Sequence, residues 1–279
     1  MIAFSIGSIN IYRYGVFYVI AFVVGYVFLR FVANKKIFLK KNPNLQRVLD
    51  NNLEDILLYI ILGILIGGRL GHVLIYNFSY YFANPIEIFQ IRKGGMSFIG
   101  GMIGVVASIF LFKRINKLNK SDFGLLFDLI LAIVPFGIMI GRIGNYLNQE
   151  LYGVVVPFNY TMFYPKIVMF LQKINVFHVY DKIDNALRVN TNFLSAFFEG
   201  FVLLIITMLI IKKWIINKKY RAGQITGIFL IFYSFFRFLF EYLRYDSQLE
   251  FIGPLTISQY FFIIFFFVGV CLFSKKITL

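Results

Sequence analysis

Long apolar stretches run through this chain and restrict what it can fold into. A helix needs roughly 20 residues to cross the hydrocarbon core of a bilayer. Seven stretches reach or approach that length: about 11–33, 56–76, 96–112, 123–141, 193–211, 225–243 and 257–273. With 59% hydrophobic and 15% charged residues, the composition excludes a soluble globular domain. We therefore predict an all-α, polytopic membrane protein with about seven transmembrane helices, forming a single transmembrane domain over residues 1–279.

Positive charge is divided unevenly between the predicted connections. The chain has 28 Lys and Arg residues against 13 Asp and Glu, and more than half of the basic residues follow the first, third, fifth and seventh stretches. The short connections on the other side hold only Arg92, Lys93 and Arg244. Because basic loops stay in the cytoplasm, the N-terminus is predicted outside and the C-terminus inside. The one long connection, about 142–192, then faces outward, and loops of that length are usually functional.

Several ionisable residues lie inside the predicted spans, where a charge costs at least a few kcal/mol. They are Arg69, Asp128, Glu199, Arg237 and Glu241, with Arg142 and Glu150 just past a predicted helix end. At a helical rise of about 1.5 Å per residue, the three arginines fall in the outer half of the membrane or at its surface. Tyr14 and residues 96–101 are predicted at the same level. Tyr233, Arg237 and Glu241, spaced i, i+4, i+8, share one helix face.

Three arginines at one depth, with fewer acids to match them, are typical of a phosphate site, because the planar guanidinium donates paired hydrogen bonds. The phosphate most available at that level belongs to a phospholipid head group. The alternative is that Arg237 and Glu241 only neutralise one another between helices. The paired glycines Gly94-Gly95 and Gly100-Gly101 favour close approach of a lipid or a peptide to the backbone.

Cysteine and histidine are scarce. The chain has one cysteine, Cys271, and two histidines, His72 and His178. A thiolate cluster or a multi-histidine metal site needs more such ligands, so we predict no metal and no cofactor. The basic surplus is spread over short anchors rather than gathered in a basic domain, and nucleic acid is therefore not expected as a partner.

Five sequence blocks point to one known family. They are Tyr14-Gly15, Gly67-Gly68-Arg69-Leu70-Gly71, Gly94-Gly95-Met96-Ser97-Phe98 followed by Gly100-Gly101, the run from Gly141 to Gly153, and Tyr233 to Arg244. On these blocks the chain resembles the prolipoprotein diacylglyceryl transferases, and the resemblance covers nearly the whole chain. The run from Gly141 to Gly153 is the most specific of them, because it is too long to match by chance.

The resemblance implies a reaction. The diacylglyceryl group of phosphatidylglycerol passes to the lipobox cysteine thiol in the signal peptide of a bacterial prolipoprotein, which forms a thioether and releases glycerol phosphate. It also implies a place, the cytoplasmic (inner) membrane, with the active site toward the outer leaflet. Arg142 and Arg237 would hold the phosphate, Glu150 and Glu241 would orient these arginines, and Asn145 and Tyr233 would supply neutral hydrogen bonds. The other implied substrate-binding residues are Tyr14, Arg69, Ser97, Gly100, Gly101 and Gly153.

Two departures from the family pattern affect the expected chemistry. Ile99 occupies the position of a histidine proposed as the base, and residues 189–195 replace the motif His-Pro-Ser-Gln-Leu-Tyr-Glu. Nearby arginines lower the pKa of a thiol, and Glu150 is a candidate substitute base. The alternative is a non-catalytic relative that keeps a phospholipid site for lipid binding or lipoprotein docking. A transporter would have inverted repeats and broken midplane helices, and the sequence has no internal repeat.

Overall fold

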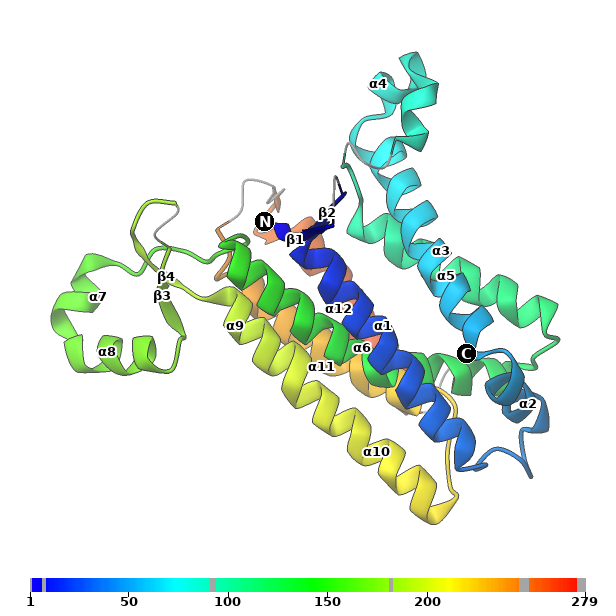
Figure 1. Cartoon of the computed structure of the whole chain (residues 1–279). Coiled ribbons are helices and arrows are strands. Elements are labelled where there is room, and N and C mark those ends of the chain that lie inside the picture. Colours follow the sequence, from blue (N-terminus) through cyan, green and yellow to red (C-terminus); the bar gives the residue numbers. More distant parts are fainter. Residues whose placement is uncertain (1, 7–8, 91–93, 181–182, 246–250, 275–279) are drawn as a thin grey trace. The chain divides into compact units, whose positions relative to one another are not determined.

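The protein is mostly helical (Figure 1). The computed structural model describes residues 2–6, 9–90, 94–180, 183–245 and 251–274, and the side chains of all of these except 2–6, 9–14, 76, 98–99 and 251–252. Five helical segments are long and apolar enough to cross a membrane: Gly15–Asn34, Leu53–Ile75, Lys120–Asn148, Thr191–Asn217 and Gln224–Glu241. The apolar helix Ile257–Phe273 is shorter. The chain is thus a polytopic membrane protein, as predicted.

Each of the seven apolar stretches lies mainly on a helix, although residues 11–12 belong to a strand and residues 96–97 precede a helix. The helices are α1 (Arg13–Asn34), α2 (Pro43–Asn51), α3 (Leu53–Gly71), η1 (His72–Tyr76), α4 (Phe78–Ala83), η2 (Pro85–Phe89), α5 (Phe98–Ile115), α6 (Lys120–Asn148), α7 (Phe158–Phe163), α8 (Pro165–Lys173), α9 (Thr191–Ser195), η4 (Ala196–Val202), α10 (Leu203–Asn217), α11 (Gln224–Glu241) and α12 (Ile257–Phe273). Three antiparallel hairpins accompany them, β1 (Ile2–Ile6) with β2 (Ile9–Tyr12), β3 (Phe177–Val179) with β4 (Leu187–Val189), and β5 (Phe251–Ile252) with β6 (Leu255–Thr256).

The predicted end of the fourth span was wrong. Residue 141 was expected to end the helix, but α6 continues to Asn148, so Arg142 and Asn145 lie on the helix and not past its end. The polar residues do not stop the helix, because they alternate with Ile143 and Leu147 at helical spacing. The helix ends where Gln149 takes a left-handed backbone conformation, with φ of 56°.

The chain divides into two compact units. The smaller unit, Tyr26–Phe123, is built on the packing of α3 against α5. Glycines on the two helices allow their backbones to touch: a Cβ on Gly63 would lie 2.8 Å from the carbonyl oxygen of Gly104, and one on Gly71 would lie 2.5 Å from the Cα of Gly100. No larger side chain fits at these crossings without moving a backbone, which is the small-residue packing of membrane helices.

The larger unit, Met1–Gly25 with Gly124–Leu279, contains α6, α10, α11 and α12 (Figure 1). Buried hydrogen bonds join these helices. On α6, Asp128 Oδ1 accepts from the backbone N (2.7 Å) and Oγ1 (2.6 Å) of Thr226 on α11. Thr207 Oγ1 on α10 donates to Ala132 O on α6 at 2.8 Å. Such hydrogen bonds offset part of the cost of burying polar groups in an apolar interior, although Asp128 Oδ2 has no partner among the described residues.

One membrane segment of the larger unit is not a regular α-helix. Between α9 and α10 lie seven residues of π-helix, η4, and Gly200 within it packs against the backbone of Met139 on α6. π-helical turns are rare and occur frequently at functional sites. Two polar residues, Ser195 at the end of α9 and Glu199 within η4, lie on this part of the segment.

Candidate active site

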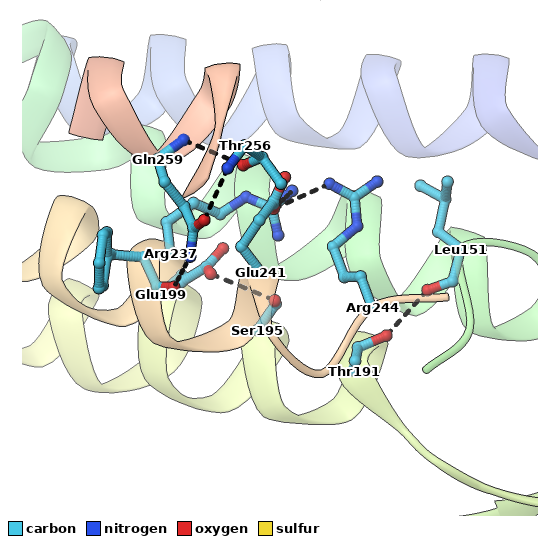
Figure 2. Close-up of polar contacts among 10 residues, drawn as sticks. Leu151, Thr191, Ser195, Glu199, Arg237, Glu241, Arg244, Thr256 and Gln259 are labelled. Atoms are coloured by element: carbon cyan, nitrogen blue, oxygen red, sulfur yellow. Dashed lines mark hydrogen bonds and ion pairs between the residues drawn. The ribbon is translucent and has the colours of Figure 1, made fainter. Parts of the chain in front are cut away.

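A buried ion-pair network lies at the end of α11 (Figure 2). Glu241 Oε2 is 3.3 Å from Arg237 Nη2 and 3.2 Å from Arg244 Nη1. The first pair joins successive turns of one helix face, as the i, i+4 spacing predicted. Glu241 is 3% exposed and Arg237 8% exposed, so these charges are shielded from water and their interactions are stronger than on a surface. One carboxylate therefore orients two arginines.

Glu199 is a second carboxylate of the same region, contributed by η4. It is fully buried, and its Oε1 accepts from Ser195 Oγ at 3.2 Å (Figure 2). Its Oε2 is buried without a hydrogen-bond partner among the described residues. Electrostatic interactions link Glu199 to Arg142 on α6 and to Tyr233 on α11. By its sequence position Glu199 is an ionisable residue within a predicted span, and the family resemblance implies no role for it.

Arg142 lies on the wall of a cavity of about 170 Å³. The polar lining is Arg142 and Tyr146 from α6, Asn175 from the turn after α8, and Asn192 from α9, and the apolar lining is Ile143, Phe193 and Ala196. The Arg142 guanidinium makes no hydrogen bond or ion pair with any residue that the structure describes, whereas its charge interacts with that of Arg237. Two nearby cations, one of them without a direct partner, favour an anion.

The end of α6 positions the predicted residues Asn145 and Glu150. The backbone N of Glu150 donates to Asn145 O at 3.1 Å, and Asn192 Nδ2 donates to Glu150 O at 2.7 Å. The turn after the helix is therefore tied to the cavity wall through Asn192. Partial burial raises the pKa of the Glu150 carboxyl above its ordinary value, because desolvation disfavours the charged form. A carboxylate with a raised pKa is a stronger base.

Gly153 lies where three chain segments meet. Its N donates to Val189 O at 3.0 Å, and the next residue, Val154, donates from N to Leu243 O at 3.0 Å. A Cβ at position 153 would lie 2.5 Å from Val189 O and 2.7 Å from Leu243 O. The position therefore excludes a side chain, and its backbone joins the segment after α6 to β4 and to the residues that follow α11, where Arg244 lies.

The smaller unit holds four other predicted residues. The Arg69 guanidinium, near the end of α3, donates to five backbone carbonyls, those of Glu87 (2.6 Å), Ile88 (2.7 Å), Gln90 (3.4 Å), Gly94 (2.6 Å) and Gly95 (3.1 Å). Gly94 and Gly95 have φ of 82° and 80°, a conformation that glycine adopts without strain. Ser97 caps α5 by accepting from the N of Gly100 at 3.1 Å, and Gly101 follows in the first turn. Arg69 thus fastens the segment before α5 to α3.

Four of the predicted residues of the larger unit, Arg142, Tyr233, Arg237 and Glu241, interact electrostatically across α6 and α11. Asn145, Glu150 and Gly153 lie on the last turns of α6 and in the segment after it. Tyr14 lies at the start of α1, and its side chain is outside the described residues. Arg244, Glu199, Asn192 and Asn175 were not among the predicted site residues. A sequence signal exists only for the two charged ones, since the asparagines lie in ordinary polar segments.

Metal-ligating side chains do not gather in the described ranges. Among residues 2–6, 9–90, 94–180, 183–245 and 251–274 there is no group of three or more His, Cys, Asp or Glu side chains that could hold a metal ion. The charged groups of the site are instead three arginines, Arg142, Arg237 and Arg244, and three carboxylates, Glu150, Glu199 and Glu241. These six groups carry no net charge when all are ionised, so the attraction for an anion rests on Arg142, whose guanidinium has no direct partner among the described residues.

The fold and this cluster define a polytopic membrane protein whose helices enclose an arginine-rich cluster. The chain belongs to the prolipoprotein diacylglyceryl transferase family, whose profile it matches over residues 1–275. Three relatives carry the name phosphatidylglycerol–prolipoprotein diacylglyceryl transferase. The one from Rickettsia felis is 40% identical over 260 residues, 92% of this chain and 89% of the relative. Those from Rickettsia bellii and Pseudoalteromonas translucida are 37% and 36% identical, over 98% and 89% of this chain and 94% and 81% of the relatives.

Proposed function

We infer that this chain is a phosphatidylglycerol–prolipoprotein diacylglyceryl transferase, and we propose that the cluster around Arg142 and Arg237 is its active site. The family match covers almost the full length, and the relatives are named for this activity. The observation that carries the site is Arg142: a guanidinium without a hydrogen bond or ion pair among the described residues, on a cavity wall and within electrostatic reach of Arg237.

The proposed reaction breaks the bond between the glycerol carbon of the diacylglyceryl group and the phosphate oxygen. Arg142 and Arg237 hold the phosphate and stabilise the charge that develops on the departing glycerol phosphate. Preorganised donors of this kind contribute several kcal/mol in a site that excludes water. Glu241 keeps Arg237 and Arg244 in place, while Tyr233 and Asn145 supply neutral hydrogen bonds. Gly153 contributes through the backbone junction in which it is enclosed by Val189 O and Leu243 O.

The thiol proton goes to Glu150 in this mechanism. The lipobox cysteine of the prolipoprotein loses its proton to the Glu150 carboxylate, the thiolate sulfur attacks the glycerol carbon, a thioether forms, and glycerol phosphate leaves. The neighbouring arginines lower the pKa of the thiol, and burial raises that of Glu150, so the two pKa values approach one another. No metal or cofactor takes part, and the family's usual histidine, replaced by Ile99, is not needed.

Tyr14, Arg69, Ser97, Gly100 and Gly101 are further proposed substrate-binding residues, four of them in the smaller unit. Ser97, Gly100 and Gly101 lie buried in the cap and first turn of α5, so they contribute by positioning this helix start. Arg69 contributes by holding the backbone carbonyls of Glu87, Ile88, Gln90, Gly94 and Gly95. Phosphatidylglycerol and the prolipoprotein signal peptide both arrive from the membrane, and no nucleic acid is involved.

We further propose seven transmembrane helices in a single transmembrane domain, residues 1–279, with the N-terminus outside and the C-terminus cytoplasmic. The five long apolar helices, α12 and α5 supply this number. The segment at about 142–192 then faces outward. In a bacterial cytoplasmic (inner) membrane this arrangement directs the active site toward the outer leaflet, where arginines at the outer level meet lipid head groups.

The test is transfer of labelled diacylglycerol from phosphatidylglycerol to a lipobox peptide by the purified protein. Arg142→Ala and Arg237→Ala should each lose about 10²- to 10³-fold in kcat. Arg47→Ala, the same substitution at an exposed position of α2, is the control and should retain the parent rate. No transfer by the parent, together with arginine-dependent binding of phosphatidylglycerol, would instead establish the non-catalytic, lipid-binding relative that Ile99 and residues 189–195 favour.

A further inference from the structure

Glu199 is a buried carboxylate that the proposed mechanism does not use. It lies on η4, is fully buried, and its Oε1 accepts from Ser195 Oγ at 3.2 Å (Figure 2). Its Oε2 accepts no hydrogen bond from the residues that the structure describes. Because this side chain is closed to solvent, it does not contact phosphatidylglycerol or the thiol directly. Any part that it takes in the reaction is therefore exerted through a neighbouring residue.

The packing of η4 against α6 brings Glu199 close to Arg142. A Cβ on Gly200, the next residue, would lie 2.6 Å from Met139 Cβ and 2.9 Å from Met139 Cα. Met139 precedes Arg142 by one helical turn, so both lie on one side of α6. Ala196, one turn before Glu199, lines the cavity wall together with Arg142. The contacts on both sides of Glu199 in the chain thus join η4 to the part of α6 that carries Arg142.

The distribution of charge shows why Arg142 needs this carboxylate. Glu241 is shared by two other arginines, at 3.3 Å from Arg237 and 3.2 Å from Arg244. Arg142 makes no ion pair of this kind within the described ranges, and the positive charge of Arg237 acts on it. The negative charge of Glu199 opposes this repulsion. Removal of one member of a buried set of charges leaves the others uncompensated, so Glu199 stabilises the charged Arg142 inside the helices.

A carboxylate near Arg142, but not hydrogen-bonded to it, also limits how tightly the site holds an anion. Its negative charge attracts the guanidinium and repels a bound phosphate. Glycerol phosphate, the product of the proposed reaction, carries about two negative charges at pH 8, because the second pKa of a phosphate monoester is about 6. Phosphatidylglycerol carries one. The repulsion is therefore roughly twice as large for the product as for the donor, and a weaker hold on the product means faster release.

We propose that Glu199 is a positioning residue that sets the charge of the phosphate site: it compensates Arg142 within the helices and weakens the hold on glycerol phosphate, so that the product leaves. The inference rests on the proposed function and deepens it, because it assigns product release to a carboxylate that touches neither substrate. Ser195 supports this role, since its hydroxyl group holds Oε1 in place by a hydrogen bond.

The experiment measures the binding of two anions to Glu199→Gln, a variant of almost the same shape without the charge. Calorimetry at pH 8 gives the Kd of glycerol phosphate and of dihexanoyl phosphatidylglycerol, and a transfer assay gives inhibition by glycerol phosphate. Loss of the negative charge should tighten donor binding by about 3- to 10-fold and product binding by about 10- to 10²-fold. Inhibition of transfer by glycerol phosphate should strengthen accordingly. A purely structural role of Glu199 would not tighten binding in proportion to ligand charge.

Asp128→Asn is the matched control. It also removes the charge of a fully buried carboxylate, but Asp128 lies on α6 at about 21 Å along the helix from Arg142. It should leave both dissociation constants within about 2-fold of the parent values. A tightening in this variant equal to that in Glu199→Gln would assign the effect to net charge and overturn the role of Glu199.

Melting temperatures test the pairing of Glu199 with Arg142 separately. Glu199→Gln and Arg142→Gln each leave one buried charge uncompensated, and each should melt below the parent. The double variant removes both charges and should regain most of the loss, because residues that interact are not additive. This measurement decides the question even if Glu199→Gln is too unstable for calorimetry: losses that simply add in the double variant overturn the pairing.

The outcomes separate this inference from the function on which it rests. Glycerol phosphate that binds Glu199→Gln no more tightly than the parent overturns the role of Glu199 in product release and leaves the transferase intact. Tighter product binding by Glu199→Gln, in a protein whose parent form transfers no diacylglycerol, supports the charge-setting role and overturns the transferase.

Discussion

Gly153→Ala tests whether the junction after α6 determines the geometry of the active site. The new Cβ would meet Val189 O at 2.5 Å, Leu243 O at 2.7 Å and Thr191 Cγ2 at 3.0 Å. The two oxygens are backbone atoms that already accept hydrogen bonds from N of Gly153 and Val154. The two backbones must therefore move apart by several tenths of an ångström, and they cannot relax by rotating a side chain.

The expected losses of stability and of activity follow from this displacement of the two backbones. Overpacking of a tight contact costs about 1–3 kcal/mol, and the free energy of unfolding should fall by that amount. Leu243 immediately precedes Arg244, which pairs with Glu241 at 3.2 Å, so the shift reaches the arginine network. A misplacement of 1 Å in an active site costs about 10²-fold. A smaller shift should therefore lower kcat/KM by roughly 10- to 10²-fold.

The assay is diacylglyceryl transfer at a temperature where the variant is fully folded, with thermal unfolding measured on the same preparation. Gly137→Ala is the control, because a Cβ at this position of α6 has no other atom within 4 Å. It should leave transfer unchanged. If Gly153→Ala is less stable but its folded form transfers at the parent rate, the junction supports the fold alone, and the link from position 153 to Arg244 is refuted.

Three further predictions concern single carboxylates. Glu241→Gln leaves Arg237 and Arg244 buried without their shared counter-charge, and should lower the free energy of unfolding by about 3–5 kcal/mol together with kcat; an unchanged melting temperature and rate would contradict the network. Glu150→Gln should lower kcat by about 10²- to 10⁴-fold and abolish the acid limb of the pH–rate profile. In the parent this limb should lie above the pH of an ordinary glutamate, because burial raises the pKa of Glu150 and activity is lost as the pH falls through that value; an identical limb in the variant would exclude Glu150 as the base. Asp128→Ala removes the acceptor for two hydrogen bonds from Thr226. It should lower the free energy of unfolding by about 2–4 kcal/mol without changing the KM for phosphatidylglycerol, and Asp128→Asn, which keeps Oδ1, should have a smaller effect. Equal melting temperatures for the parent and both variants would refute a stabilising role of these hydrogen bonds.

Hydropathy and charge spacing predicted the membrane helices and part of the cluster, because both are local properties of the sequence. The apolar stretches all became helices, and Arg237 and Glu241 pair across one turn as their spacing indicates. The five backbone partners of Arg69 could not be predicted, because the segment that carries them has no periodic pattern. The burial of Asn192 Oδ1 without a hydrogen-bond partner among the described residues could not be predicted either, because it depends on a tertiary contact between the turn after α6 and α9.

The π-helix η4 also changes how positions on this membrane segment are counted. A π-turn contains about one residue more than an α-turn, so a helical wheel drawn upward from α10 assigns Asn192 and Ser195 to a face about 100° from the true one. The phase offset is a single residue. Deleting one residue within η4 would shorten the helix by only about 1.5 Å, yet it would rotate Asn192 away from the cavity while α10 stayed in register with α6. The π-helical turn thus rotates the side chains of α9 relative to those of α10, so that one continuous membrane helix directs different faces before and after Glu199.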